Sequence, residues 1–151
     1  MSLIFAISAS IFILDYFLKL YLKNNFAFHS LPLIENILHI TVVFNKGAAF
    51  GILQKHTYLL ILIGIFFIGV LLLALLKDKK RTLSDNIIFG LIIGGASSNL
   101  FDRIVYGYVI DYIQVPIWKI FGKTWPVFNI SDSCISIAAL ILAIKILKKS
   151  G

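Results

Sequence analysis

The chain of 151 residues is 60% hydrophobic and only 14% charged, with a formal net charge of +7. Soluble domains contain about 25% charged residues, so this composition excludes an ordinary soluble domain and favours a polytopic membrane protein. The lysines cluster at segment ends instead of lining one basic face, which predicts contact with anionic membrane lipids and no nucleic-acid partner. The single cysteine, Cys134, excludes an internal disulfide and a cysteine-based metal cluster. The three histidines lack metal-ligand spacing, so we expect no metal and no cofactor.

Four apolar stretches approach the length of about 20 residues that a transmembrane helix needs. They are residues 3–22, 58–76, 86–101 and 130–147. The first lacks the basic start of a secretory signal, so we expect it to be a retained helix. No repeat or linker separates the four. The sequence therefore predicts a single membrane α-helical domain over residues 1–151, with a small extracytoplasmic region that contains β-structure.

The first span carries two charged residues, Asp15 and Lys19, four positions apart. Residues at this spacing share one helix face, and the acid-first order favours an ion pair. Pairing lowers the free energy of burying either charge inside a membrane. A structural ion pair is therefore favoured over a direct chemical role.

The connection at residues 23–57 contains ILHITVVFN, a β-branched run typical of a strand. The run ends at Asn45, and Lys46, Gly47 and two alanines follow. Gly47 permits close approach of the backbone, and Asn45 can both donate and accept hydrogen bonds. Taken alone, the segment from Asn45 to Phe50 favours a tight turn between a strand and a helix.

Two short segments with packed basic residues indicate the orientation. They are KDKKRTLSD, between the second and third spans, and KILKKSG at the end of the chain. Short basic segments remain on the cytoplasmic side, so we expect both termini there. The connections at residues 23–57 and 102–129 then lie outside.

The third span is rich in small residues, with Gly90 and Gly94 spaced as GxxxG. Such spacing favours close packing between helices. Asn99, Asp102 and Arg103 follow. We expect Asp102 and Arg103 to form a local polar cluster in the loop, where the arginine keeps the neighbouring carboxylate ionised.

The connection at residues 102–129 contains YGYVIDYIQV, whose alternation suits a strand. Its aromatic density fits a belt at the membrane interface, and anchoring there is favoured over substrate stacking for most of these rings. The aromatic residues are Tyr106, Tyr108, Tyr112, Trp118, Phe121 and Trp125.

Asp111 and Asp132 have no basic neighbour in the sequence. Desolvation among apolar neighbours raises the pKa of Asp111. If Asn129 or Ser131 caps the fourth span, Asp132 lies in its first turn, where the helix dipole favours the ionised form. A carboxyl and a carboxylate so divided are what a two-carboxylate hydrolase requires. Spacing alone leaves open a plain helix cap beside an interfacial aspartate.

In this order, the polar residues resemble the motifs of the lipoprotein signal peptidase family, signal peptidase II. The resemblance covers nearly the whole chain, from Asp15 and Lys19 to Asn129 and Asp132. Between these ends come N-x-G-A-A-F at 45–50, G-G-A-x-x-N-x-x-D-R at 94–103 and V-x-D-Y at 109–112. Two positions depart from the family pattern. Ser98 stands where glycine is usual and Ser131 where alanine is usual, so we expect altered packing or hydrogen bonding there without loss of activity.

The resemblance implies an intramembrane aspartic peptidase that cleaves diacylglyceryl-modified prolipoproteins just before the lipidated cysteine. The implied catalytic pair is Asp111 and Asp132. The implied supporting and substrate-binding positions are Asn45, Gly47, Asn99, Arg103 and Asn129, and the structural polar positions are Asp15, Lys19 and Asp102. We expect a monomer in the bacterial inner membrane, with both termini cytoplasmic and the active site near the outer face.

Two other functions compete with this reading. In a small proton-coupled transporter or channel, Asp15, Asp111 and Asp132 would relay protons, but such acids would be distributed across the membrane instead of gathering at one end. A non-enzymatic scaffold would leave Asp111 and Asp132 without a role.

Overall fold

The computed structural model describes residues 1–27, 29–47, 53–77, 80–120 and 123–150. Four helices form the body of the molecule: α1 (Ser2–Phe26), α2 (Thr57–Lys77), α3 (Leu83–Tyr106) and α4 (Ile130–Ser150). Each is long and apolar enough to cross a membrane. The predicted membrane α-helical fold is therefore confirmed, and each predicted span lies within one of these helices.

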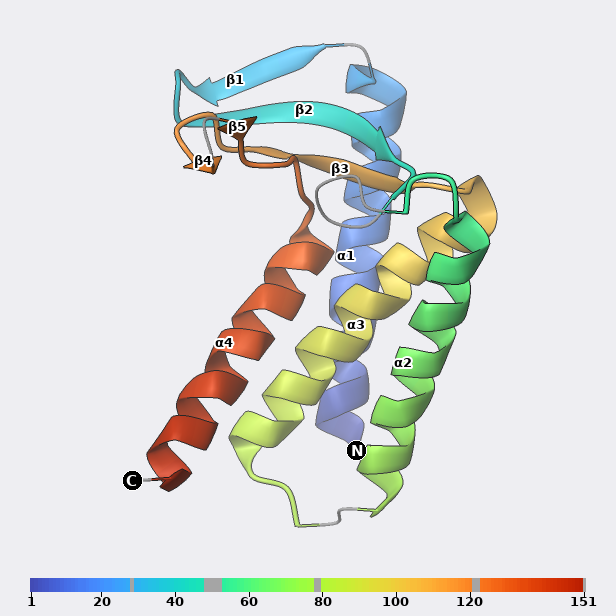
Figure 1. Cartoon of the computed structure of the whole chain (residues 1–151), viewed down its shortest axis with the longest axis vertical. Coiled ribbons are helices and arrows are strands. Elements are labelled where there is room, and N and C mark those ends of the chain that lie inside the picture. The colour runs from blue at the N-terminus through green and yellow to red at the C-terminus, as the bar shows by residue number, and fades with distance from the viewer. Residues whose placement is uncertain (28, 48–52, 78–79, 121–122, 151) are drawn as a thin grey trace.

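A small antiparallel sheet lies across one end of the helices (Figure 1). It consists of β1 (Ser30–Ile34), β2 (Leu38–Asn45) and β3 (Val109–Gln114), in that order, and a hairpin of β4 (Lys119–Ile120) and β5 (Lys123–Thr124) lies beside it. The predicted β-containing region is confirmed in both connections. The two termini and the link between α2 and α3 lie at the opposite end of the molecule (Figure 1).

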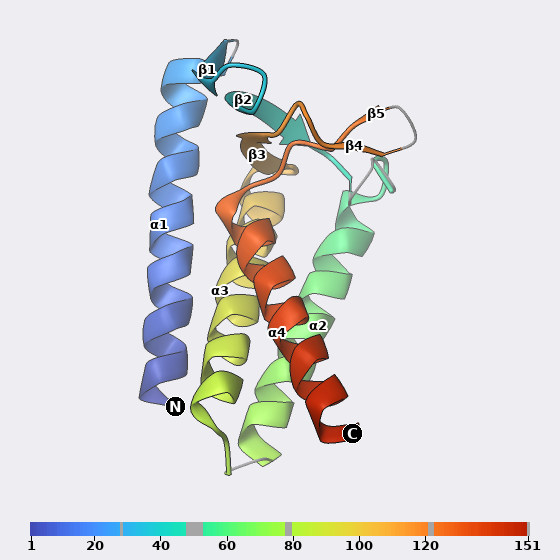
Figure 2. The same ribbon diagram turned by 90° about the vertical axis from the view of Figure 1, so that its left-hand side faces the viewer.

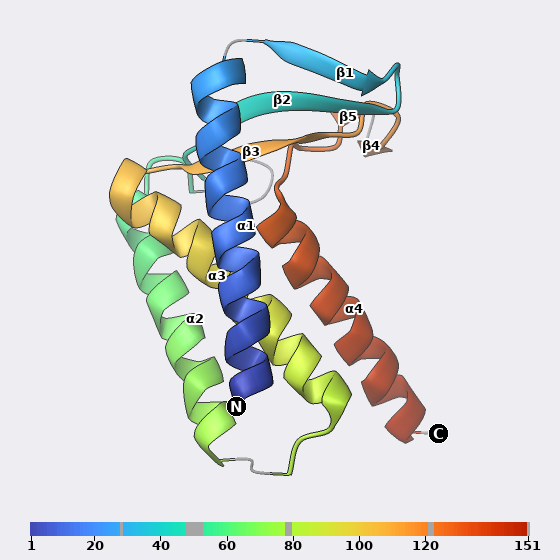
Figure 3. The ribbon, with the colours of Figure 1, turned by 180° about the vertical axis from the view of Figure 1, so that it is seen from behind.

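Helix α3 occupies the middle of the bundle and packs against α1, α2 and α4 (Figures 2 and 3). Its glycines permit this close contact. A Cβ atom added at Gly94 would lie 2.9 Å from the Ser8 backbone of α1, and one added at Gly95 would lie 2.6 Å from the Ser131 carbonyl oxygen of α4. The predicted small-residue packing is confirmed, and it sets α1 and α4 on two sides of α3.

The third span differs from its prediction because α3 begins earlier and ends later than residues 86–101. Thr82 caps its start in a capping box with Asp85, and Gly107 ends it with a φ of 78°. Positive φ is unstrained only for glycine, which explains the stop. Asp102 and Arg103 therefore lie on the helix and not in a loop. Their charges suggested an exposed segment, whereas the structure buries Asp102 among partners.

Strand β3 is confirmed, but its burial does not alternate. The four residues from Val109 to Tyr112 are all buried, because β2 pairs along one edge while α1 and α3 pack against the strand. Tyr112 is 1% exposed and so does not belong to an interfacial belt, unlike Trp118, which is 51% exposed. Phe121 and the predicted turn residues Ala48 to Phe50 lie outside the described residues.

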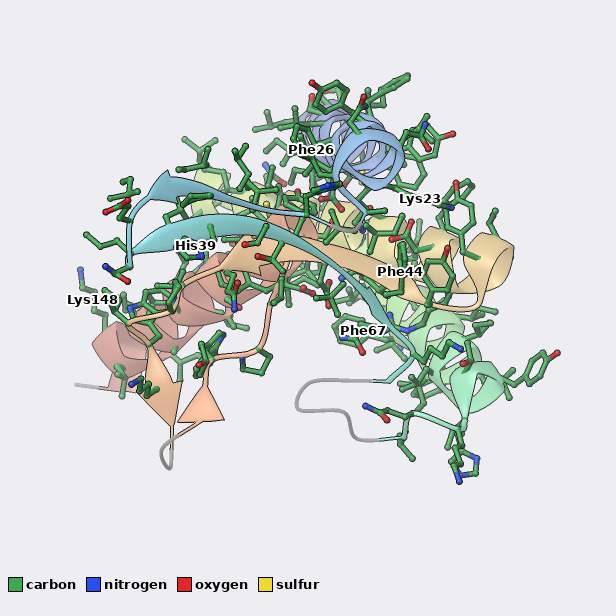
Figure 4. All side chains as sticks on the ribbon, turned by 90° about the horizontal axis from the view of Figure 1, so that it is seen from above. Lys23, Phe26, His39, Phe44, Phe67 and Lys148 are labelled. Atoms are coloured by element: carbon green, nitrogen blue, oxygen red, sulfur yellow. The ribbon has the colours of Figure 1, made fainter. Side chains whose placement is uncertain are left out.

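Figure 4 views the sheet from above, with His39 and Phe44 toward opposite ends of β2. The end of the β2 strand curves toward the helices (Figure 1). Its last residue, Asn45, pairs with Val109, and Val43 pairs with Asp111. Side chains two residues apart on a strand share a face, so this register brings Asn45 to the same face as Asp111.

Candidate active site

The segment before α4 joins β3 and thereby brings two distant parts of the sequence together. Phe128 forms an isolated antiparallel bridge with Ile113, with backbone N–O distances of 2.7 and 3.0 Å. The next residue, Asn129, is completely buried beneath β3. As a result, the start of α4 lies beside the residue at the centre of β3, Asp111.

Asn129 caps α4, as one of the two predicted alternatives proposed. Its side-chain Oδ1 accepts a hydrogen bond from the backbone N–H of Asp132 at 2.8 Å. In return, the backbone N–H of Asn129 donates to Asp132 Oδ2 at 3.2 Å. These reciprocal bonds are the capping-box arrangement. They fix the Asp132 carboxylate in the first turn of α4.

Asp111 is held by two asparagine amides from different elements. Asn45 Nδ2 donates to its Oδ2 at 2.9 Å, and Asn129 Nδ2 donates to its Oδ1 at 2.8 Å. Burial, followed by the nearby charge of Asp132, raises the pKa of Asp111 to about 7, although both amide bonds lower it. The predicted effect of desolvation on Asp111 is confirmed. The ionised state of Asp132 stays a prediction.

Asn45 is itself oriented by the chain that follows it. The backbone N–H of Gly47 donates to Asn45 Oδ1 at 3.0 Å, which turns the amide nitrogen toward Asp111. The Gly47 carbonyl accepts from an Arg103 guanidinium nitrogen at 3.1 Å. Gly47 thus links β2 to α3 through its backbone, so its role here needs no side chain.

Asn99 connects the two aspartates through the interior of the site. Its Nδ2 donates to Asp132 Oδ1 at 2.8 Å, and its Oδ1 accepts from Asn129 Nδ2 at 3.0 Å. Lys19 also donates to Asn99 Oδ1, at 3.0 Å. Because Oδ1 faces two donors, the amide nitrogen of Asn99 is directed to Asp132 and not away from it.

A cavity of about 540 Å³ opens onto this cluster. Its walls are mostly apolar, and the polar groups come from β2, β3, α3 and α4. Polar lining comes from Asn45, Asn99, Arg103, Asp111, Asp132, Ser133 and Ser136, and the rest comes mainly from α4 and from the segment between Trp118 and Phe128. A large apolar pocket with a few converging polar groups is the usual form of a binding site.

The predicted ion pair of Asp15 and Lys19 is confirmed, with an N–O distance of 2.7 Å and both side chains at most 1% exposed. Lys19 forms a second ion pair with Asp102 at 2.9 Å. The predicted Asp102–Arg103 cluster is therefore wrong. Neighbours on a helix point in different directions, so Asp102 turns inward to α1 while Arg103 turns to the Asn99 and Gly47 carbonyls.

The structure thus brings most of the predicted site residues into one connected cluster. Sequence reasoning missed the role of Tyr112, whose hydroxyl donates to Asp15 Oδ1 at 2.8 Å on the face of β3 opposite to the Asp111 side chain. It also missed Trp118 and Trp125 as walls of the cavity. The alternation of side chains along a strand was the available signal, because it sends Asp111 and Tyr112 to opposite faces. Among the described residues, no three His, Cys, Asp or Glu side chains are grouped to hold a metal ion.

Comparisons with known proteins agree with this geometry. The family model described as signal peptidase (SPase) II matches residues 7–148. A lipoprotein signal peptidase of Halothermothrix orenii is 39% identical over 144 residues, covering 93% of this chain and 92% of that protein. One from Syntrophus aciditrophicus is 38% identical over 156 residues, covering 97% and 94% respectively. A solved bacterial membrane enzyme has a TM-score of 0.89 at 30% identity, covering 100% of this chain and 91% of that one.

The fold and the site therefore define a multi-pass bacterial membrane peptidase. The chain belongs to the signal peptidase II family.

Proposed function

We propose that this chain removes signal peptides from prolipoproteins by aspartic-peptidase chemistry, with Asp111 and Asp132 as the catalytic pair. One observation carries the proposal: two carboxylates from separate elements line the same cavity, and the Asn129 side chain donates to the Asp111 carboxylate and accepts from the backbone N–H of Asp132. The names of the relatives support the substrate class. The substrates are diacylglyceryl-modified prolipoproteins, cut just before the lipidated cysteine.

The reaction is hydrolysis by a water held between the two carboxyl groups. The pair shares one proton, and the ionised member takes a proton from the water as it attacks the scissile carbonyl. The protonated member donates a hydrogen bond to that carbonyl and stabilises the tetrahedral intermediate. It then supplies a proton to the leaving amine. A pKa of about 7 for Asp111 supports its being the protonated member near neutral pH.

The surrounding polar residues hold the pair in place. Asn45 and Asn129 fix both oxygens of Asp111, and Asn99 fixes Asp132. Because amides donate hydrogen bonds without a net charge, they orient the carboxylates without forcing both to remain ionised. Arg103 lines the cavity and is attracted by both carboxylates, so it is placed to hold a substrate carbonyl.

The site's position fits a substrate that arrives within the membrane. The cavity lies where the sheet meets the helices, and isoleucines of α4 line it. With both termini cytoplasmic, this end of the bundle faces the outer side of the inner membrane. An apolar signal helix and acyl chains then contact lipid and the α4 wall, while the scissile bond reaches the aspartates. A single copy suffices, because one chain supplies every residue of the site.

The test uses purified protein and a lipidated prolipoprotein. Asp111→Asn and Asp132→Asn should each lower kcat by about a hundredfold to ten-thousandfold, the usual contribution of acid–base groups. Asp85→Asn is a matched control, since Asp85 lies in the first turn of α3, away from the cavity lining. Normal cleavage by either site variant would rule out the assigned pair. If the unmodified protein failed on a validated substrate, a proton-coupled transporter would become the better reading.

A further inference from the structure

The buried Asp15 carboxylate has four hydrogen-bond and ion-pair partners. It is 0% exposed. Its Oδ2 accepts from Ser98 Oγ at 2.7 Å and from Ser131 Oγ at 2.6 Å, and it pairs with Lys19 at 2.7 Å. Its Oδ1 accepts from the Tyr112 hydroxyl at 2.8 Å. Lys19 already neutralises the charge of this carboxylate, so the three additional hydroxyl donors call for a further explanation.

Each of these hydroxyl donors is adjacent in sequence to a residue of the candidate site. Tyr112 follows Asp111, Ser98 precedes Asn99, and Ser131 lies between Asn129 and Asp132. The donors also come from three elements, namely β3, α3 and α4. Asp15 therefore contacts the sequence neighbours of Asp111, Asp132 and Asn99, and so helps to fix the backbone from which these three side chains extend.

Tyr112 strengthens this connection because its hydroxyl has two partners. It donates to Asp15 and accepts from the backbone N–H of Ile130 at 3.1 Å, at the first residue of α4. One oxygen atom therefore joins α1, β3 and α4. The path from Asp111 to Asp132 through Tyr112, Asp15 and Ser131 lies on the side of β3 opposite the cavity.

We propose that Ser98 and Ser131 are positioning residues that act through Asp15 and Tyr112 to fix the separation of Asp111 and Asp132. The inference rests on the proposed function, because it takes those two aspartates as the catalytic pair. It assigns a purpose to the two serines at which this chain departs from the signal peptidase II pattern. Glycine and alanine have no hydroxyl and cannot supply these bonds.

The serines are suited to positioning and not to binding. Neither lines the cavity, whereas Ser133 and Ser136 do. Ser98 and Ser131 are at most 2% exposed, so their hydroxyls do not reach substrate or bulk water. Their loss should therefore change how the aspartates are held without changing the surface that contacts the substrate.

The first measurement compares Ser98→Ala, Ser131→Ala and the double variant with Ser8→Ala. Ser8 is a matched control because its hydroxyl, on α1, donates to the Gly90 carbonyl of α3 at 3.1 Å. This bond crosses the same helix interface, and Ser8 does not line the cavity. The double variant should lower kcat about tenfold or more at an unchanged KM, since small misplacements of reacting groups are costly. Ser8→Ala should match the unmodified protein.

The second measurement asks whether the serines act through Asp15 and Tyr112. Tyr112→Phe keeps the ring in place and removes the hydroxyl that joins Asp15 to β3. It should lower kcat on its own, and adding it to the serine double variant should cost much less than the product of the separate effects. Multiplying effects would overturn the proposed path.

The third measurement separates positioning from stability by the pH profile. Asp111 is influenced by Asp132 on α4, Lys19 on α1 and Arg103 on α3. If Asp111 and Asp132 move apart, the repulsion that raises the pKa of Asp111 weakens and that pKa falls. The basic limb of the kcat profile then shifts to lower pH. A purely structural role would lower the active fraction equally at every pH and leave the limb in place.

Carbon-13 NMR of labelled aspartate in detergent micelles measures the titration of Asp111 without any substrate, with Asp111→Asn assigning the signal. A shift of that titration in the serine double variant, absent in Ser8→Ala, supports the proposal. An unshifted titration together with a normal kcat overturns it. If the unmodified protein cleaves no prolipoprotein, the proposed function fails, and the NMR titration still decides whether the serines position Asp111.

Discussion

The molecule contains two carboxylate clusters that differ in how they are neutralised. In the structural cluster, Asp15 and Asp102 both pair with the buried ammonium group of Lys19. In the second cluster, named catalytic after the proposed function, amides and a backbone N–H hold Asp111 and Asp132, and neither forms an ion pair within the described residues. A neighbouring cation favours the charged form of a carboxylate, whereas amides orient it without adding a charge. The same residue type is thus paired with a cation in one cluster and held by neutral donors in the other.

The largest effect on stability should come from breaking the structural cluster. Lys19→Met leaves two buried carboxylates without their cation. Removing one partner of a buried ion pair costs about 3–5 kcal/mol, so the free energy of unfolding in detergent should fall by that amount. Asp111→Asn removes no partner of an ion pair among the described residues and should leave stability unchanged or higher. A Lys19→Met protein as stable as the unmodified one would contradict the distinction between the clusters.

The pH dependence of stability should distinguish the catalytic cluster. The pKa of Asp111 is raised from 3.8 to about 7. Asp111 therefore binds its proton more tightly in the folded state than in the unfolded state. The contribution of this proton to the free energy of unfolding is full below about pH 4 and is lost as pH rises through about 7. Relative to Asp111→Asn, the unmodified protein should lose roughly 2–4 kcal/mol across this window. Parallel curves from chemical unfolding at each pH would contradict the raised pKa.

A change at the contact between α3 and α4 should affect both stability and cleavage. In Gly95→Ala, the new Cβ would lie 2.6 Å from the Ser131 carbonyl oxygen. The overpacking should cost roughly 1–3 kcal/mol and should also lower kcat, because the start of α4 carries Asp132. Gly69→Ala is the matched control, since an added Cβ there meets no atom within 4 Å. Equal behaviour of the two variants in unfolding and cleavage assays would rule out this coupling.

The smallest effect should come from the ion pair of Lys145 with Asp85, at the end of the bundle away from the sheet. Both side chains are partly exposed. Lys145→Ala should lower the free energy of unfolding by less than about 1 kcal/mol and leave cleavage unchanged. A measurable loss of cleavage activity would mean that the structure at this end of the bundle affects the site.

Local patterns in the sequence predicted the elements and the local ion pair. Hydropathy located the four helices, a β-branched run located β2, an alternating run located β3, and the i,i+4 spacing paired Asp15 with Lys19. The GxxxG spacing correctly indicated close helix packing. Each of these signals acts within a few residues along the chain.

Contacts between distant residues could not be predicted in the same way. Lys19 reaches Asp102 and Asn99 only because glycines bring α3 close to α1. The proximity of Asp102 and Arg103 in the sequence was misleading, since adjacent helical residues diverge. The Ser98 and Ser131 hydroxyls were expected to change packing or hydrogen bonding, and the structure shows the hydrogen bonds. Their shared partner, Asp15, follows from tertiary packing alone.

The cap formed by Asn129 has a consequence for how the protein matures in the membrane. The same side chain that begins α4 also binds Asp111. A newly inserted chain whose α4 has not yet closed its first turn, or whose β3 has not yet docked, has no assembled pair of aspartates. Under the proposed function, proteolytic activity would therefore depend on the closure of α4 and the docking of β3 together.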